Sequence, residues 1–153
     1  MTKPEKAVLK LHEYIKNKKL LEIACGSAEF SVSAADLAAS VHCIDSDPHR
    51  IMPEVIEHEN ITVRKMNASD LLFPDDSFDT VVMYNAVARL AGEMEKAVAE
   101  AMRVGGDTVL ISSLNTDKYV IFDELLPMLE RERIPFCLMM DGEFAGVVLR
   151  RHK

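Results

Sequence analysis

The sequence predicts a single α/β domain in which helices cover both faces of a mostly parallel sheet. Short apolar runs alternate with segments of helical periodicity along most of the 153 residues. Such alternation is typical of parallel strands joined by helical crossovers. The last two apolar runs flank Asp141-Gly142, which favours a tight hairpin turn. We therefore expect residues 1–153 to form one doubly wound, three-layer sandwich of seven strands that ends in an antiparallel hairpin.

Composition narrows the class of protein. The length suits one domain with a real core. No apolar run reaches the roughly 18 residues of a membrane-spanning helix, and the Lys- and Glu-rich N-terminus does not resemble a signal peptide. The net charge of −7 disfavours non-specific nucleic-acid binding, which needs a basic face.

The cysteines predict a reducing environment. Cys25, Cys43 and Cys137 lie inside or beside apolar runs, and three cysteines cannot all pair. We expect them to be reduced and largely buried in a cytoplasmic protein. No Cys-x-x-Cys motif or histidine cluster indicates a metal, so no metal ligand is predicted.

The first expected helix runs from Pro4 to Asn17. Its apolar residues recur at helical spacing, and proline is favoured in a first turn. We expect this helix to pack on the sheet. The alternative is a lid over a bound ligand.

The next unit is the centre of the chain. Leu20, Leu21 and Ile23 form a short buried strand, four small residues follow from Cys25 to Ala28, and a helix is expected from Glu29 to Ala39. Ligands bind outside the carboxyl ends of such strands, where small side chains let them approach the backbone. Glu22 places a carboxylate within the strand, which suits a ligand with an ammonium group.

The second strand, Val41 to Ile44, ends on Asp45, 19 residues beyond Gly26. An acid at that offset can accept hydrogen bonds from ribose hydroxyls, although a turn or cap role is the alternative. We expect Asp47 to bind the backbone instead, as the N-cap of a helix that begins at Pro48 and ends near Glu57.

The remaining elements follow from the same patterns. Pro127 should kink or split the helix in which it lies. We expect strands at Ile61–Met66, Asp79–Tyr84, Thr108–Ser112, Pro135–Met140 and Phe144–Arg150, a loop at Ser113–Asp117, and helices at Gly92–Arg103 and from that loop to about Arg133.

Three segments carry a resemblance to a family. The sequence Glu22 to Ala28 is similar to the D/E-x-G-x-G-x-G motif of class I S-adenosylmethionine-dependent methyltransferases, with Ala24 and Ala28 where glycine is usual. Residues 67–82, NASDLLFPDDSFDTVV, resemble that family's G-D-A-x-x-L-P-F-x-x-x-S-F-D-x-V-V segment. Arg103 to Gly106 resembles R-V-L-K-P-G-G with three residues missing, so the turn into the next strand should be tight.

This resemblance implies a Rossmann-like fold with strand order 3-2-1-4-5-7-6 and S-adenosylmethionine as cofactor. Glu22 would lie near the methionine amino group, Asp45 would bind the ribose, and the amide of Asn67 would read adenine in place of the usual acid. We found no general base, so the catalytic residues are unknown. The implied cofactor-binding residues are Glu22, Ala24, Cys25, Gly26, Ser27, Ala28, Asp45, Ser46, Asn67, Ala68, Tyr84 and Asn85.

Two other functions compete with this one. In a nicotinamide or flavin dinucleotide enzyme the G-x-G-x-x-G motif would fall on Ala24, Gly26 and Glu29, and the carboxylate of Glu29 would repel the pyrophosphate. The second alternative is a non-catalytic S-adenosylmethionine-binding or partner-subunit domain, because fold alone does not give function.

The methyl acceptor cannot be read from the sequence. The Asn/Asp-Pro-Pro-aromatic motif is absent at Tyr84 to Val87, which disfavours methylation of a flipped nucleic-acid base. The acidic charge favours a small molecule or a protein. The short connections late in the chain leave either an open site for a bulky acceptor or a pocket completed by another chain, in a homo- or hetero-oligomer.

Overall fold

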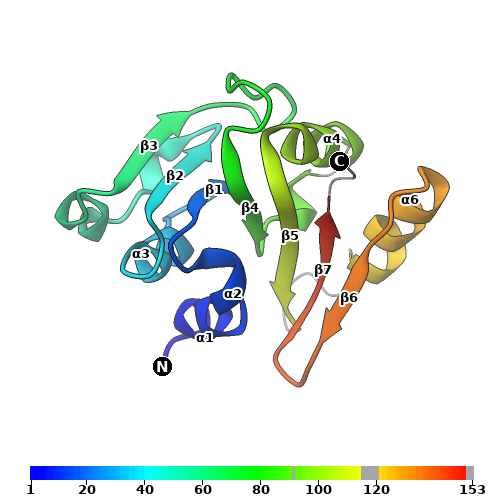
Figure 1. The fold of residues 1–153 in the computed structure, drawn as a ribbon, viewed down its shortest axis with the longest axis horizontal. Coiled ribbons are helices and arrows are strands. Elements are labelled where there is room, and N and C mark those ends of the chain that lie inside the picture. Colours follow the sequence, from blue (N-terminus) through cyan, green and yellow to red (C-terminus); the bar gives the residue numbers. More distant parts are fainter. Residues whose placement is uncertain (91, 115–120, 151–153) are drawn as a thin grey trace.

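The computed structural model describes residues 1–90, 92–114 and 121–150. It confirms the seven-stranded sheet in the order β3-β2-β1-β4-β5-β7-β6, which Figure 1 shows from one edge to the other. The pairs β1–β2, β1–β4, β2–β3 and β4–β5 are parallel, whereas β7 runs antiparallel to β5 and β6. The strands are β1 (Lys19–Ile23), β2 (Ser40–Asp45), β3 (Ile61–Lys65), β4 (Phe78–Tyr84), β5 (Gly105–Ser113), β6 (Cys137–Met140) and β7 (Phe144–Arg150).

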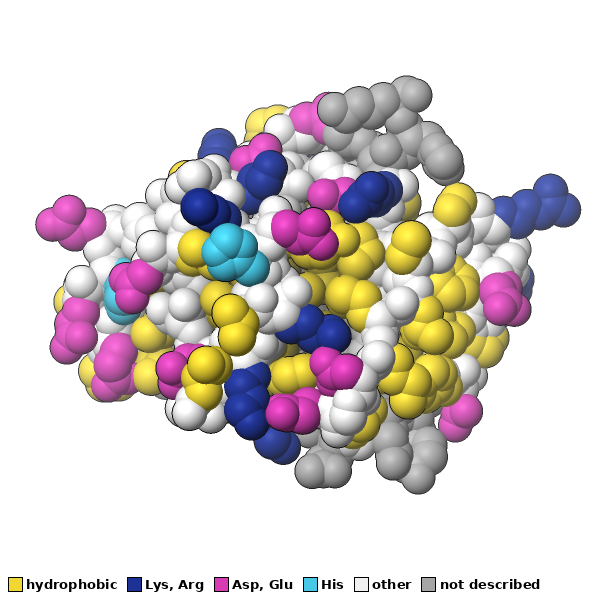
Figure 2. Space-filling model, turned by 60° about the horizontal axis from the view of Figure 1, so that its bottom comes forward, with side chains coloured by type: hydrophobic (Ala, Val, Ile, Leu, Met, Phe, Trp, Pro, Cys, Tyr) yellow, Lys and Arg dark blue, Asp and Glu magenta, His cyan; other side chains and the backbone are white. Residues whose placement is uncertain are grey.

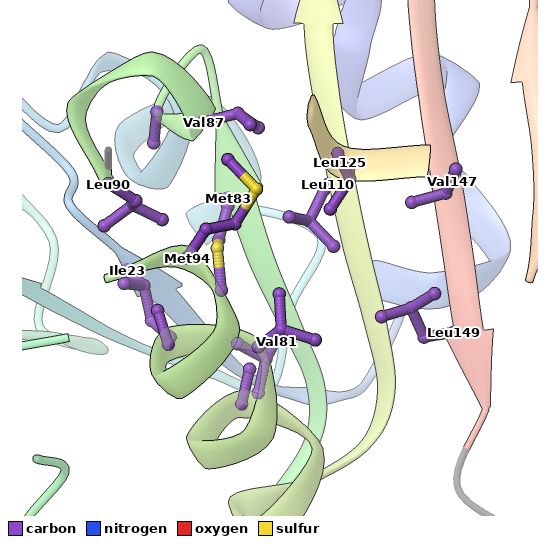
Figure 3. Close-up of a cluster of buried hydrophobic side chains, with 14 of the residues drawn as sticks. Ile23, Val81, Met83, Val87, Leu90, Met94, Leu110, Leu125, Val147 and Leu149 are labelled. Atoms are coloured by element: carbon purple, nitrogen blue, oxygen red, sulfur yellow. The ribbon is translucent and has the colours of Figure 1, made fainter. Parts of the chain in front are cut away.

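Helices cover both faces of this sheet, as predicted. One face packs against α1 (Lys3–Lys10), α2 (His12–Ile15) and α3 (Glu29–Ala35). The other packs against α4 (Met94–Val104) and α6 (Leu126–Arg131), and Figure 3 shows its side chains interlocking around Met83 and Leu110. Successive residues of a strand point to opposite faces, so Val81 and Met83 face α4 while Val82 faces α3.

Several element boundaries differ from the sequence prediction. The N-terminal helix breaks at Leu11 into α1 and α2, and it lies against the sheet rather than over the cleft described below. Helix α3 ends at Ala35, four residues early. The split near Pro127 is confirmed, because a π-helical turn at Ile121–Leu125 gives way to α6, which has Pro127 as its second residue. The expected loop Ser113–Asp117 and the start of the helix after it lie partly outside the described residues.

The prediction of a helix between Pro48 and Glu57 is wrong. The chain forms two short 3₁₀ turns, Pro48–Arg50 and Pro53–Glu57, separated by extended backbone. Pro53 explains the break, since a proline lacks the amide hydrogen and forces the preceding residue into extended backbone. Met52 accordingly has φ −71° and ψ 146°.

The turn between α4 and β5 is as tight as predicted. Helix α4 ends at Val104 and β5 begins at Gly105. A Cβ atom at this glycine would lie 2.5 Å from Val81 Cγ2. Only glycine therefore allows the helix to join the strand without a connecting loop.

The cysteine prediction holds for two residues of three. All three cysteines are free, and Cys25 and Cys43 are buried. Cys137 is exposed, which corrects the expectation that it would be buried. It lies on the edge strand β6, three of whose four residues are exposed. In the described part of the chain, no helix is both long and apolar enough to cross a membrane.

Candidate active site

A cleft lies where β1, β2 and β4 end, and it contains two cavities. The larger, about 440 Å³, is lined by five of the predicted residues, Ala24, Asp45, Ser46, Asn67 and Ala68. The smaller, about 210 Å³, is lined by six others, Glu22, Cys25, Gly26, Ser27, Tyr84 and Asn85. Ala28, the remaining one, is fully buried. The fold therefore brings eleven of the twelve predicted residues to the wall of one cleft.

The loop after β1 has an unusual backbone that creates this cleft. Ala24, Gly26 and Ala28 have φ values of 56°, 58° and 68°, so every second residue is left-handed. The loop is held to β2 by a hydrogen bond from the amide of Cys25 to the carbonyl of Ile44. The two alanines thus adopt the conformation of the usual glycines, at a cost of roughly 1–2 kcal/mol each.

Asp45 connects this loop to the one that follows β2. Its Oδ2 accepts a hydrogen bond from the amide of Gly26 at 2.8 Å, and its Oδ1 accepts one from the amide of Asp47 at 3.0 Å. The residue is 7% exposed and lines the larger cavity. Each carboxylate oxygen has a second lone pair, so Asp45 can still accept from a ligand.

The expectation that Asp47 caps a helix through its side chain is wrong. Asp47 makes no side-chain cap, and its carboxylate instead pairs with His49 at 2.7 Å. Asp45 is the residue that binds the backbone, while also facing the cavity. A carboxylate at the end of a buried strand can reach amides on both neighbouring loops, which an exposed loop residue cannot.

Glu22 is the buried carboxyl group of the smaller cavity. It is 1% exposed, and Ser31 Oγ donates a hydrogen bond to its Oε1 at 2.7 Å. Burial raises the pKa of Glu22 to about 8, although the Ser31 hydrogen bond acts in the opposite direction. The group is therefore protonated at neutral pH, and a nearby cation would favour its ionised form.

Two predicted amide side chains are engaged by the protein itself. Asn67 Oδ1 accepts from the amide and the hydroxyl of Ser69, at 2.9 and 2.8 Å. Asn85 Oδ1 accepts from the amide of Ser113 at 2.8 Å, which joins the ends of β4 and β5. Asn67 thus stabilises a local turn and Asn85 connects two strand ends, so neither side-chain carbonyl is free of a protein donor.

Tyr84 closes one side of the smaller cavity. Its ring stacks on Phe30 of α3, with centroids 5.3 Å apart and planes inclined by 28°. Burial, together with the nearby carboxyl groups of Glu29 and Glu22, raises the pKa of the Tyr84 hydroxyl. Tyr84 is therefore a neutral hydrogen-bond donor at physiological pH and not a general base.

The sequence analysis missed several residues of this site, four of which bear on the smaller cavity. Phe30, Arg50 and Arg89 line the smaller cavity, and Ser31 is the hydrogen-bond partner of Glu22. Ser31 could have been found as a polar residue on the apolar face of the expected helix. Arg89 could have been found because it follows the end of β4 by five positions. Among the described residues, no group of three or more His, Cys, Asp or Glu side chains is arranged to hold a metal ion.

Comparison with known proteins identifies the family of this site. The family described as "Methyltransferase domain" matches residues 21–108, more than half of the chain, from within β1 through β2, β3 and β4. The chain belongs to this methyltransferase family. The matching family model does not identify the methyl acceptor.

Solved structures show how widely this methyltransferase fold is shared. A SAM-dependent methyltransferase from Aquifex aeolicus superposes with a TM-score of 0.75 at 18% identity, covering 96% of this chain and 88% of that one. The YcgJ protein of Bacillus subtilis superposes with a TM-score of 0.74 at 14% identity, covering 98% and 99%. At these identities the likeness concerns the fold.

A curated relative matches a shorter stretch. Phosphatidylethanolamine N-methyltransferase of Cereibacter sphaeroides is 41% identical over 59 residues, which are 37% of this chain and 29% of that protein. The match thus covers less than a third of the relative's length.

Proposed function

We propose that this domain binds S-adenosylmethionine across the cleft, with the adenosine in the larger cavity and the methionine part in the smaller one. The observation that supports this proposal is the placement of two buried carboxyl groups, Asp45 in the larger cavity and Glu22 in the smaller one. Asp45 would accept hydrogen bonds from the ribose hydroxyls, and Glu22 would face the methionine ammonium group. Ala24 to Ala28 would lie beneath the ligand between them.

The chemistry of the two cavities fits this cofactor. The larger one combines Asp45 with the apolar side chains of Met66, Ala68 and Leu90, as an adenosine requires. The smaller one contains the carboxyl groups of Glu22 and Glu29. Arg50 and Arg89 line the same cavity. Carboxyl and guanidinium groups side by side suit the ammonium and carboxylate groups of the methionine part.

In the reaction, the residues of the chain bind and orient. S-adenosylmethionine, when bound, supplies an activated methyl group for direct displacement. Ionised Glu22 would hold the ammonium group, Asp45 would fix the ribose, and the Tyr84–Phe30 pair would exclude water from one wall. No residue of the chain needs to form a covalent intermediate.

We propose a small molecule or a protein as methyl acceptor. The chain carries a net charge of −7, and on the face that Figure 2 shows, Lys and Arg side chains are interspersed with Asp and Glu. Both features argue against bare nucleic acid. The partial relative is named for phosphatidylethanolamine, whose amine is a small-molecule type of acceptor. We also propose that another chain completes the pocket, in a homo- or hetero-oligomer.

The three free cysteines favour a reducing compartment, so we propose a cytoplasmic location. The cofactor proposal is tested by calorimetric titration of the wild-type protein with S-adenosylmethionine, S-adenosylhomocysteine and NAD. We expect micromolar dissociation constants for the first two and no heat with NAD. Binding of NAD alone would overturn the proposal.

A further inference from the structure

Arg89 lies on a firmly anchored turn beside the cleft. It belongs to the short 3₁₀ turn Val87–Leu90 that follows β4. Val87 and Leu90 insert into the core on the α4 side, as Figure 3 shows, and are 0% and 5% exposed. The base of the arginine is therefore fixed by packing, while its side chain remains 41% exposed.

The guanidinium group of Arg89 lies on the loop that follows β1. Its Nη2 donates a hydrogen bond to the carbonyl of Ala24, and its Nη1 is 4.0 Å from Asp45 Oδ2. A Cβ atom placed on Gly26 would lie 3.3 Å from the same Nη1. The guanidinium thus covers the backbone of the loop between Ala24 and Gly26.

This position separates the two cavities. Arg89 lines the larger cavity together with Asp45 and Ala24, and it lines the smaller one together with Glu22 and Tyr84. Any ligand that has one end at Asp45 and the other at Glu22 must pass the loop between them. Arg89 and Arg50 both line this passage, and Arg89 is hydrogen-bonded to the loop itself.

We propose that Arg89 is a gate that controls which ligands this cleft accepts. The gate rests on the proposed cofactor site. A ligand confined to the larger cavity leaves the Arg89–Ala24 hydrogen bond intact. A ligand that spans both cavities must break this bond and move the cation away from Asp45, so part of its binding free energy is spent on opening. Arg89 therefore lowers the affinity for spanning ligands selectively.

The experiment compares two probes that differ in reach. Adenosine fits within the larger cavity, whereas S-adenosylhomocysteine spans both. We would titrate each by calorimetry into the wild type, into Arg89→Met, and into Arg64→Met as a matched control. Arg64, on β3, packs over the ring of Phe73 and lies outside both cavities. Its substitution by Met removes the same charge.

Arg89→Met should raise the affinity for S-adenosylhomocysteine by about tenfold, the equivalent of one charge-assisted hydrogen bond. The affinity for adenosine should change less than about twofold, and Arg64→Met should match the wild type for both. An equal gain for both probes, no gain, or a loss for S-adenosylhomocysteine would each overturn the gate. If neither the wild type nor any variant bound S-adenosylhomocysteine, the proposed cofactor site itself would be overturned.

A second readout does not depend on affinity. The side-chain N–H signals of Arg89 in NMR spectra should be protected in the free protein and should lose that protection when S-adenosylhomocysteine is added, but not when adenosine is added. Arg89 signals that are the same in the free and the S-adenosylhomocysteine-bound protein would contradict displacement of the guanidinium.

Discussion

At the scale of single residues, the site depends on a carboxyl group that the fold holds in its neutral form. Glu22 lies within β1 with 1% exposure, and its pKa is raised to about 8 by burial. A cationic ligand favours the ionised form of such a carboxyl group, because its charge compensates for the hydration that burial removes. Ligand binding should therefore release a proton from Glu22 at neutral pH.

This linkage predicts a pH-dependent affinity. Between about pH 6 and 8, the affinity for S-adenosylhomocysteine should rise by up to about tenfold per pH unit, because less free energy is needed to ionise Glu22 as the pH approaches its pKa. Above about pH 8 it should level off. Calorimetry on Glu22→Gln should show a lower affinity at pH 8 without this slope, while Glu29→Gln, at the exposed rim of the same cavity, should keep it.

The carboxyl group of Glu22 also determines how the unfolding free energy changes with pH. Between about pH 4.5 and 8 the folded protein holds a proton on Glu22 that the unfolded chain has released. The unfolding free energy of the wild type should therefore fall with rising pH by up to about 1.4 kcal/mol per unit, relative to Glu22→Gln. We would measure the unfolding free energy of both proteins in urea across this pH range. The same dependence on pH in both would contradict a raised pKa of Glu22.

At the scale of elements, the side chain of Arg103 connects α4 to the loop after β3. Arg103 donates from Nη2 to the carbonyl of Leu71 at 3.0 Å and from Nη1 to the carbonyl of Phe73 at 2.9 Å. It also pairs with Asp75 and Glu100, each at 2.8 Å. These contacts fix the segment that begins at the Asn67 turn, and thereby one wall of the larger cavity.

Arg103→Met should therefore loosen this segment more than the rest of the domain. We expect the unfolding free energy to fall by about 1–3 kcal/mol, since two carbonyls and two carboxylates lose a donor. Hydrogen exchange of the Leu71 amide, which donates to Glu100, should become faster. Arg131→Met removes an exposed pair with Glu132 and should change stability by less than about 0.5 kcal/mol. Equal effects of the two substitutions would contradict this role of Arg103.

Elements were predictable where local sequence and tertiary packing agree. The unit from β1 to α3 was found because buried strand residues, a small-residue loop and an apolar helix follow one another directly. The segment after Asp47 was not, because its capping and proline signals compete: Pro48 favours a helix start, while Pro53 ends any helix five residues later. The exposure of Cys137 depends on its strand lying at the sheet edge, which an apolar run does not reveal.

At the scale of the whole molecule, the topology itself assembles the site. Parallel strands place the residues after β1, β2, β3 and β4 at one edge, so motifs far apart in sequence could be assigned to one cleft before the structure was known. The gate at Arg89 could not, because it depends on where a long side chain turns within that cleft. The hydrogen bonds from Ser69 to Asn67 Oδ1 could not be predicted either, because the sequence does not show whether this carbonyl accepts from the chain or from a ligand.

The measurement that tests this account most directly is a calorimetric titration of Asp45→Asn with S-adenosylhomocysteine. Asp36→Asn is the matched control, because Asp36 lies at the exposed end of α3, away from both cavities. Circular dichroism would first establish that both variants fold. We expect Asp45→Asn to bind at least about tenfold more weakly than the wild type, since it loses a charged acceptor for the ribose hydroxyls, and Asp36→Asn to bind as the wild type does. Unchanged affinity in a folded Asp45→Asn variant would place the cofactor outside this cleft.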